Sequence, residues 1–258
     1  MKMPKFLLLI LIFSLSGCTF FKGKEDPTIN MSAEQLYAEA SGAMDSGDYD
    51  KAVEYYEKLE SRFPFGVYGK QALLDLAYVH FKNDEPDSSV SAAERFIKLY
   101  PQNPHVDYAY YIKGLANYNR GWSFTQRYLP LDRTQRDSSS ALFAFRDFAE
   151  LTRLFPDSIY AEDARQRMIY LRNILADYEL NVANYYMRRG AFVAAANRAS
   201  YVVEKYPRTP AIPDALVIMA KAYKVLEIND LAEDALRILE LNYPSHPGLY
   251  EVRRIVVR

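Results

Sequence analysis

The stretch RRGAFVAAANRASYVVEKYP, residues 188–207, shows how each unit of this chain is built. Small or apolar residues stand 12, 8, 5 and 1 positions before Pro207, at Ala195, Ala199, Val202 and Tyr206. These offsets place the four side chains on one side of an α-helix, because the helix repeats about every 3.6 residues. Proline cannot continue a helix, since it lacks a backbone N–H and its ring clashes with the preceding turn. The stretch therefore predicts an amphipathic helix that ends just before Pro207.

The same pattern occurs five times along the chain. An aromatic residue precedes a proline at Phe63-Pro64, Tyr100-Pro101, Phe155-Pro156, Tyr206-Pro207 and Tyr243-Pro244. Further upstream, each unit carries a small residue where a second helix could pack closely, at Ala40, Ala77, Gly114, Ala183 and Ala220. Gly47 and Gly190 fit the turn between two such helices. Each unit is therefore predicted to be a pair of helices.

Paired helices with small residues at their contact and a closing proline resemble the tetratricopeptide repeat. This resemblance implies an all-α fold, a right-handed superhelical solenoid of about five helix pairs. The repeat region is expected at 32–244, with pairs at about 32–64, 67–101, 105–156, 160–207 and 210–244. Ser32 and Gln35 predict a capping box at its start. The insertion at 120–137 predicts a loop, and the uninterrupted pattern after Tyr160 predicts one long helix.

The N-terminus has the features of a lipoprotein signal peptide. Lys2 and Lys5 precede the apolar stretch Phe6–Ile12, which is short for a permanent membrane span. The next residues include Leu15-Ser16-Gly17-Cys18, which resembles the lipobox of bacterial lipoproteins. The resemblance implies that residues 1–17 are removed and that Cys18, the only cysteine, carries a covalent lipid. Thr19, where aspartate would favour the inner membrane, implies the periplasmic face of the outer membrane.

Two segments flank the repeats. Residues 18–31 have little helical periodicity and are expected to be a lipidated N-terminus and flexible linker. Residues 245–258 are expected to be a C-terminal tail.

The composition favours a binding protein. Removing Lys2 and Lys5 from the 32 basic residues leaves 30 against 33 acidic ones, so we expect no nucleic-acid partner. His80, His105 and His246 lie far apart in sequence and no catalytic motif is present, so we expect no enzymatic activity, no metal and no cofactor beyond the covalent lipid. The 22 tyrosines can supply contact area, although about half are expected to fill gaps between helices.

Three stretches resemble the BamD family of outer membrane lipoproteins: RFPFGVY at 62–68, LDRTQRD at 131–137 and RRGAFVAAANR at 188–198. The resemblance implies a scaffold of the outer membrane β-barrel assembly machinery. Its implied partners are the periplasmic domains of a BamA-like barrel-assembly catalyst, accessory Bam lipoproteins and unfolded β-barrel clients. A tetratricopeptide lipoprotein that regulates cell-wall synthesis or binds peptidoglycan is the alternative, and near-neutral charge disfavours a third role in DNA uptake.

The resemblance also implies site residues. The C-terminal repeats are expected to bind the catalyst through Arg198, with Arg189 and Asn197 beside it. A guanidinium group at that position suits a carboxylate of the partner. The N-terminal repeats are expected to bind the C-terminal signal strand of clients, at Tyr49, Phe65, Gly66 and Tyr68.

Overall fold

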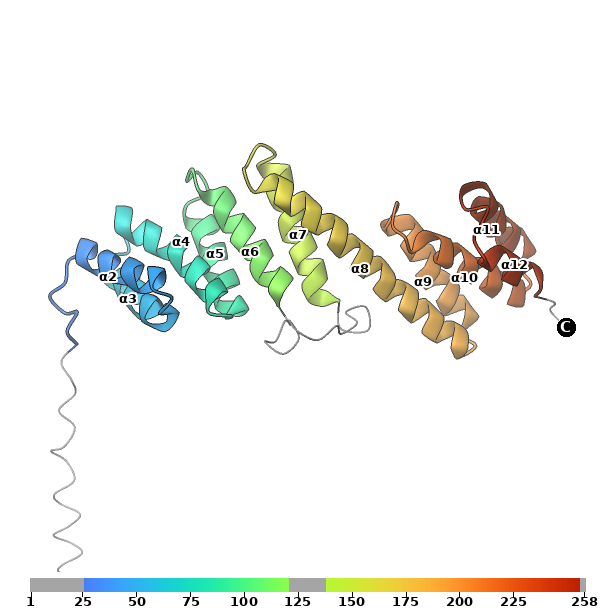
Figure 1. Ribbon diagram of the computed structural model, residues 1–258, viewed down its shortest axis with the longest axis horizontal. Coiled ribbons are helices and arrows are strands. Elements are labelled where there is room, and N and C mark those ends of the chain that lie inside the picture. The colour runs from blue at the N-terminus through green and yellow to red at the C-terminus, as the bar shows by residue number, and fades with distance from the viewer. Residues whose placement is uncertain (1–25, 121–137, 256–258) are drawn as a thin grey trace, which may run out of the picture.

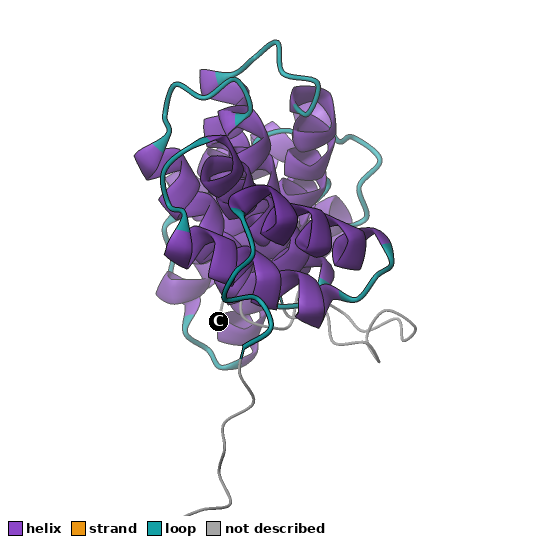
Figure 2. Cartoon of the chain, turned by 90° about the vertical axis from the view of Figure 1, so that its left-hand side faces the viewer, coloured by secondary structure: helices purple, strands orange, loops and turns teal. Residues whose placement is uncertain are grey.

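The structure is a computed structural model that describes residues 26–120 and 138–255. The described residues form eleven helices. These are α2 (Ala33–Asp45), α3 (Tyr49–Arg62), α4 (Val67–Lys82), α5 (Pro86–Leu99), α6 (Val106–Asn119), α7 (Ser139–Leu154), α8 (Ala161–Arg188), α9 (Phe192–Lys205), α10 (Ile212–Val225), α11 (Asn229–Asn242) and α12 (Gly248–Arg253). Figure 2 shows helices joined by loops, and the described residues contain no strand.

The helices pack in sequential order. α2 packs on α3, α4 on α5, α6 on α7, α8 on α9 and α10 on α11, and each pair also packs on the next. The chain therefore runs as an elongated solenoid from α2 at one end to α12 at the other (Figure 1). The prediction of an all-α solenoid of helix pairs is confirmed.

The aromatic residue before each proline ends the second helix of its pair in the same way. Each donates its backbone N–H to the carbonyl four residues earlier, with φ between −138° and −123° and ψ between 54° and 65°. These residues are Phe63, Tyr100, Phe155, Tyr206 and Tyr243. The proline that follows disfavours the α conformation at the preceding residue. The five helices therefore stop at equivalent points.

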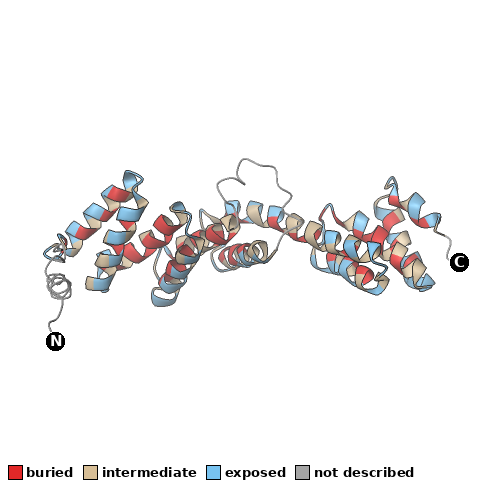
Figure 3. Ribbon diagram, turned by 90° about the horizontal axis from the view of Figure 1, so that it is seen from below, coloured by how far each residue is buried: buried red, intermediate tan, exposed pale blue. Residues whose placement is uncertain are grey.

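The repeated apolar stripe forms the core between helices. The residues 12 and 5 positions before each proline are buried in all five units. The residues 8 positions before each proline are also buried, except Leu236, which is half-buried. Figure 3 shows the buried residues along the faces where helices meet. In the third unit a Cβ at Gly114 would lie 2.5 Å from Cε1 of Phe148. Glycine is needed there because the aromatic ring fills the space that alanine occupies elsewhere.

α8 joins the two halves of the solenoid, as the long helical pattern predicted. Its 28 residues contribute Ala164 and Leu171 to one core cluster, which contains Phe148 of α7. Ala176 and Ala183, further along α8, belong to a second cluster with α9 and α10. One continuous helix therefore holds the N-terminal and C-terminal units in a fixed relation.

Residues 26–31, which the sequence assigns to a flexible linker, instead form hydrogen-bonded turns fixed to α3. The Asp26 carboxylate accepts hydrogen bonds from Lys58 Nζ at 3.1 Å and Arg62 Nη2 at 2.7 Å. Arg62 also donates to the carbonyl of Thr28, which is fully buried. Hydrogen bonds from Thr28 and Lys58 hold the pKa of the Asp26 carboxyl below its usual value. The chain therefore leaves the repeats from a defined place.

The other end of the solenoid is covered by α12, within the predicted tail. Val252 is fully buried, and its carbonyl accepts a hydrogen bond from Lys224 Nζ of α10 at 2.9 Å. A Cβ at Gly248 would lie 2.2 Å from Cγ2 of Val217, so the tail approaches α10 closely. α12 thus shields the last unit, as terminal caps do in repeat proteins.

Three predicted features lie outside the described residues. They are the signal peptide, the lipidation site Cys18 and residues 121–137 of the insertion.

Candidate protein-binding surfaces

The turn between α3 and α4 exposes two large apolar side chains. Phe65 is 91% exposed and Val67 is 77% exposed. Gly66 between them has a φ of +116°, which favours glycine. A Cβ at Gly69 would lie 2.2 Å from the carbonyl oxygen of Phe63, so the start of α4 is packed tightly against the end of α3. The apolar side chains are therefore presented to solvent by a well-packed turn, where a partner could cover them.

Tyr68, a predicted client-binding residue in the same turn, rests on other tyrosines. Its ring lies 5.5 Å from that of Tyr37, and Tyr37 packs edge-on against fully buried Tyr56 at 5.8 Å. The Tyr37 hydroxyl donates a 2.9 Å hydrogen bond to Asp75. Burial raises the pKa of the Asp75 carboxyl and that of Tyr37. Tyr37 and Asp75, which the sequence pattern did not single out, thus support this surface.

Tyr49 does not join the other predicted client-binding residues. It is the first residue of α3, whereas the turn with Phe65 follows the last. At about 1.5 Å per residue, the length of α3 separates them by about 20 Å. The ammonium of Lys82 lies 6.0 Å from the centre of the Tyr49 ring. The structure therefore brings Phe65, Gly66 and Tyr68 together and leaves Tyr49 at the opposite edge of the solenoid.

The outer face of α9 differs from those of the other second helices. The positions 14, 10 and 6 residues before each proline point away from the buried stripe. In α9 these positions hold Val193, Asn197 and Tyr201, which are exposed and uncharged. The other helices carry at least two charges there: Asp50, Glu54 and Lys58 in α3, Asp87 and Arg95 in α5, Arg146 and Glu150 in α7, and Asp230 and Asp234 in α11. Since protein interfaces are depleted of charge at their centre, the α9 face of Val193, Asn197 and Tyr201 is a candidate contact surface.

Arg198 lies beside the α9 face and is held by α8. Its Nη1 donates a 2.9 Å hydrogen bond to Oε2 of Glu179, and this carboxylate raises the pKa of Arg198. The Arg198 side chain is 47% exposed, whereas that of Glu179 is only 12% exposed. Glu179 therefore fixes the guanidinium at the surface while part of it still faces solvent, where a partner carboxylate could reach it.

Arg189 caps the end of α8, in the turn that Gly190 closes with a φ of +72°. Its Nε donates a 3.2 Å hydrogen bond to the hydroxyl of Tyr185, and its guanidinium lies 5.5 Å from the centre of that ring. Tyr185 is 48% exposed. Of the three predicted partner-binding residues, Asn197 and Arg198 are therefore neighbours on α9, and Arg189 lies at the turn that precedes this helix.

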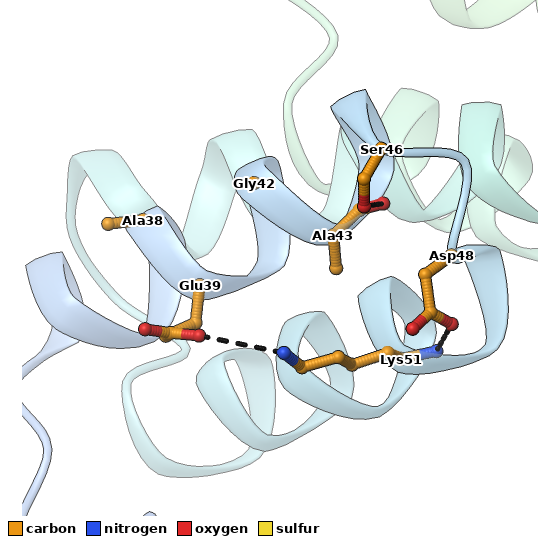
Figure 4. A pocket seen from close by; sticks show the side chains of 7 residues that line it. All are labelled: Ala38, Glu39, Gly42, Ala43, Ser46, Asp48 and Lys51. Carbon is orange, nitrogen blue, oxygen red and sulfur yellow. Dashed lines mark hydrogen bonds and ion pairs between the residues drawn. The ribbon is translucent and has the colours of Figure 1, made fainter.

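A polar pocket of about 220 Å³ lies on α2 and α3 (Figure 4). Its lining includes Gly42 and Glu39, and Glu39 pairs with Lys51 at 3.8 Å. The equivalent positions of α4 hold buried Leu76 and Val79. Glu39 and Gly42 therefore belong to an end cap, because no earlier helix pair covers α2 among the described residues.

Two further observations concern the described parts of the chain, 26–120 and 138–255. No three His, Cys, Asp or Glu side chains are grouped so that they could hold a metal ion. None of the helices there combines the length and the apolar character needed to span a membrane.

Comparison with known proteins gives extensive similarity to one group. Residues 29–238 match the protein family YfiO, described as an outer membrane lipoprotein. Outer membrane protein assembly factor BamD of Neisseria gonorrhoeae is 42% identical over 252 residues, which cover 96% of this chain and 94% of that protein. The factor of the same name from Vibrio cholerae is 37% identical over 234 residues, covering 91% and 96%. These alignments extend over both candidate surfaces.

Among solved structures, a thermophilic TPR protein of Thermus thermophilus aligns with 86% of this chain and 95% of its own. The TM-score is 0.35 and the identity 13%. The solenoid architecture therefore rests on the helix pairs of this chain itself.

Proposed function

Since this chain belongs to the YfiO family of outer membrane lipoproteins, we propose that it is a non-catalytic scaffold for outer membrane protein assembly. A lipid on Cys18 anchors it to the periplasmic face of the outer membrane. The lipobox-like residues before Cys18 and the assembly-factor names of its relatives support this role.

The α9 face is the proposed dock for the periplasmic domains of a BamA-like barrel-assembly catalyst. The observation that carries this assignment is that three exposed positions of α9 hold no charge, whereas the other second helices each carry at least two charges at the equivalent positions. Arg198 and Arg189 border the face and offer planar groups of N–H donors to a carboxylate. The matching partner surface is apolar at its centre with an acidic residue at its margin. Accessory lipoproteins of the same machinery are further proposed partners.

The N-terminal units are the proposed site for unfolded β-barrel clients. Phe65 and Tyr68 offer exposed rings beside the backbone of Gly66, and apolar or aromatic contacts suit the alternate side chains of an extended signal strand. Tyr49 lies about 20 Å away, a span of about six residues of extended chain. A client strand that runs along α3 can therefore reach both ends of the proposed site.

Affinity purification from detergent-solubilised envelopes tests the docking assignment. The wild-type protein is expected to recover a β-barrel protein with periplasmic domains. Val193→Asp places a charge on α9 at the position equivalent to Asp230 of α11, 14 residues before the proline of its unit. This variant should no longer recover the barrel protein. Leu241→Asp is the control, because Leu241 is an exposed apolar residue of α11 outside the α9 face. Recovery of a penicillin-binding protein in place of the barrel protein would favour the cell-wall alternative.

Site-specific photocrosslinking tests the client assignment. Crosslinkers at positions 65, 68 and 49 are expected to capture a peptide with the C-terminal sequence of a β-barrel protein. Tyr250 is the control position, since it is 67% exposed but belongs to α12 at the other end of the solenoid. Capture confined to the fourth and fifth units would contradict the assignment.

A further inference from the structure

Exposed apolar side chains gather where α3 ends. Ile29 is 64% exposed, Phe65 91% and Val67 77%. Ile29 follows Thr28, whose carbonyl is bound by Arg62, and Phe65 comes three residues after Arg62. All three side chains therefore lie near the end of α3, where the first helix pair meets the second, and we refer to Ile29, Phe65 and Val67 as the N-terminal apolar edge.

Positive charge borders this edge. The stretch 63–69 contains no charged residue, and it is followed by Lys70. The Lys70 ammonium lies 5.9 Å from the centre of the Tyr100 ring, and Lys98 comes two residues before Tyr100. The nearby carboxylate of Asp26 is already paired with α3. Exposed apolar side chains with neighbouring lysines are typical of surfaces that contact anionic lipid headgroups.

The chain path ties the edge to the proposed lipid anchor. Asp26 is fixed to the end of α3, and Cys18 precedes it by eight residues. Eight residues of fully extended chain span at most about 28 Å. A lipid on Cys18 therefore keeps the end of α3 closer to the membrane surface than a free linker over the whole segment 18–31 would.

We infer that the N-terminal apolar edge lies in the headgroup layer of the membrane that holds the lipid, as a second membrane contact. This inference rests on the proposed lipidation of Cys18. The acyl chains supply most of the membrane affinity, so the contact mainly sets the orientation of the solenoid on the membrane. Two attachment points, the lipid and the edge, hold the solenoid at a set angle to the membrane. Ile29 and Val67 belong to this contact alone, whereas Phe65 is shared with the proposed client site.

Fluorescence of the full lipidated protein tests the inference. Cys18 is the only cysteine and is consumed by the lipid, so a cysteine introduced by Val67→Cys or Ile29→Cys can be labelled alone. Val193→Cys is the matched control, because Val193 is a 60% exposed valine far from the anchor. The protein is bound to vesicles of phosphatidylethanolamine and phosphatidylglycerol. A polarity-sensitive dye at position 67 or 29 should shift to the blue and be quenched by headgroup nitroxides, whereas the dye at 193 should be quenched by aqueous iodide.

Three results would overturn the inference, and they are distinguishable. If the protein floats with the vesicles but the dye at 67 and 29 stays accessible to iodide, the edge does not touch the membrane and the anchor proposal stands. If the blue shift appears only after a client peptide is added, the edge is a peptide-binding surface. If wild-type protein does not float with the vesicles, the lipid anchor itself is wrong and the inference fails with it. Circular dichroism of each variant confirms that the helices are intact.

Discussion

The α3–α4 turn and the α8–α9 region are built from the same repeat yet present different chemistry. The first lies between two units and exposes aromatic and aliphatic side chains backed by Tyr37. The second lies within a unit and combines an uncharged helix face with an arginine held by Glu179. The repeat fixes the backbone at both places, so a few outward side chains can give each unit its own partner.

The two regions also differ in what supports them. Tyr68 packs on Tyr37, whose hydroxyl donates a hydrogen bond to the partly buried carboxyl of Asp75. Arg198 is instead held by an ion pair between neighbouring helices. Because different contacts support the two proposed surfaces, a substitution at one of them is expected to leave the other intact. The following predictions test whether the two surfaces act independently and how much each contributes.

Reversing the charge of Arg198 should have the largest effect on one surface alone. Arg198→Glu is expected to weaken binding of the barrel-assembly catalyst by about 2 to 5 kcal/mol, because it removes one half of a charge pair that binding desolvates. Isothermal titration with the purified periplasmic domains measures the loss. Arg95→Glu is the control, since Arg95 also lies on a second helix, about half exposed, and pairs with Glu60 of the preceding unit. Equal losses in both variants would show that the effect is not local to α9.

Breaking α8 should uncouple the two regions. Ala176 is fully buried in the middle of this helix, and proline there removes a backbone hydrogen bond at a cost of about 3 kcal/mol or more. Ala176→Pro is expected to convert a single thermal transition into two, because each half keeps its own core cluster. Calorimetry follows the transitions. A proline variant that still unfolds in one step would mean that the halves are coupled by other contacts.

Removing Tyr68 should weaken client binding without affecting the catalyst. Tyr68→Ala is expected to cost about 1 kcal/mol in affinity for a client signal peptide, roughly fivefold, because an aromatic contact is lost. Tyr49→Ala is the comparison at the far end of α3. Fluorescence anisotropy with a labelled peptide gives both affinities. A larger loss of affinity for Tyr49→Ala than for Tyr68→Ala would show that the main client contact lies at the other edge of the solenoid.

Asp75 should make the free energy of unfolding of the N-terminal region slightly dependent on pH. Burial raises its folded-state pKa above the unfolded value of about 3.9, so the folded protein binds the proton more readily. The stability gained from protonation is complete below the unfolded pKa and is lost as pH rises through the folded pKa. The wild type should therefore gain stability relative to Asp75→Asn as pH is lowered from about 7 to about 4. Urea unfolding at each pH measures this difference, and a constant difference would contradict the prediction.

Local patterns were enough to predict the helix pairs. The offsets from each proline predicted the second helices, which end at Arg62, Leu99, Leu154, Lys205 and Asn242. Gly47 and Gly190 adopt the positive φ expected of their turns, and Ser32 with Gln35 forms the capping box. These features depend on residues only a few positions apart, so periodicity and the chemistry of proline and glycine are sufficient to predict them.

The segments outside the periodic pattern were harder to predict. Residues 26–31 resembled a free linker because their partners, Lys58 and Arg62, lie more than 30 positions away. α12 is short, and its place depends on the fit of Gly248 against Val217. No local signal distinguishes such segments from a tail or a linker, because their order comes from contacts with distant residues.

The residues of this chain fixed where helices begin and end, which faces are buried and which cysteine could carry a lipid. The packing of helices settled the rest: that Tyr68 rests on Tyr37 while Tyr49 lies at the opposite edge, and that Glu179 holds Arg198. The physical reason is range. A helix is stabilised by hydrogen bonds four residues apart, whereas these contacts join residues 19 to 31 positions apart that meet only when neighbouring helices pack.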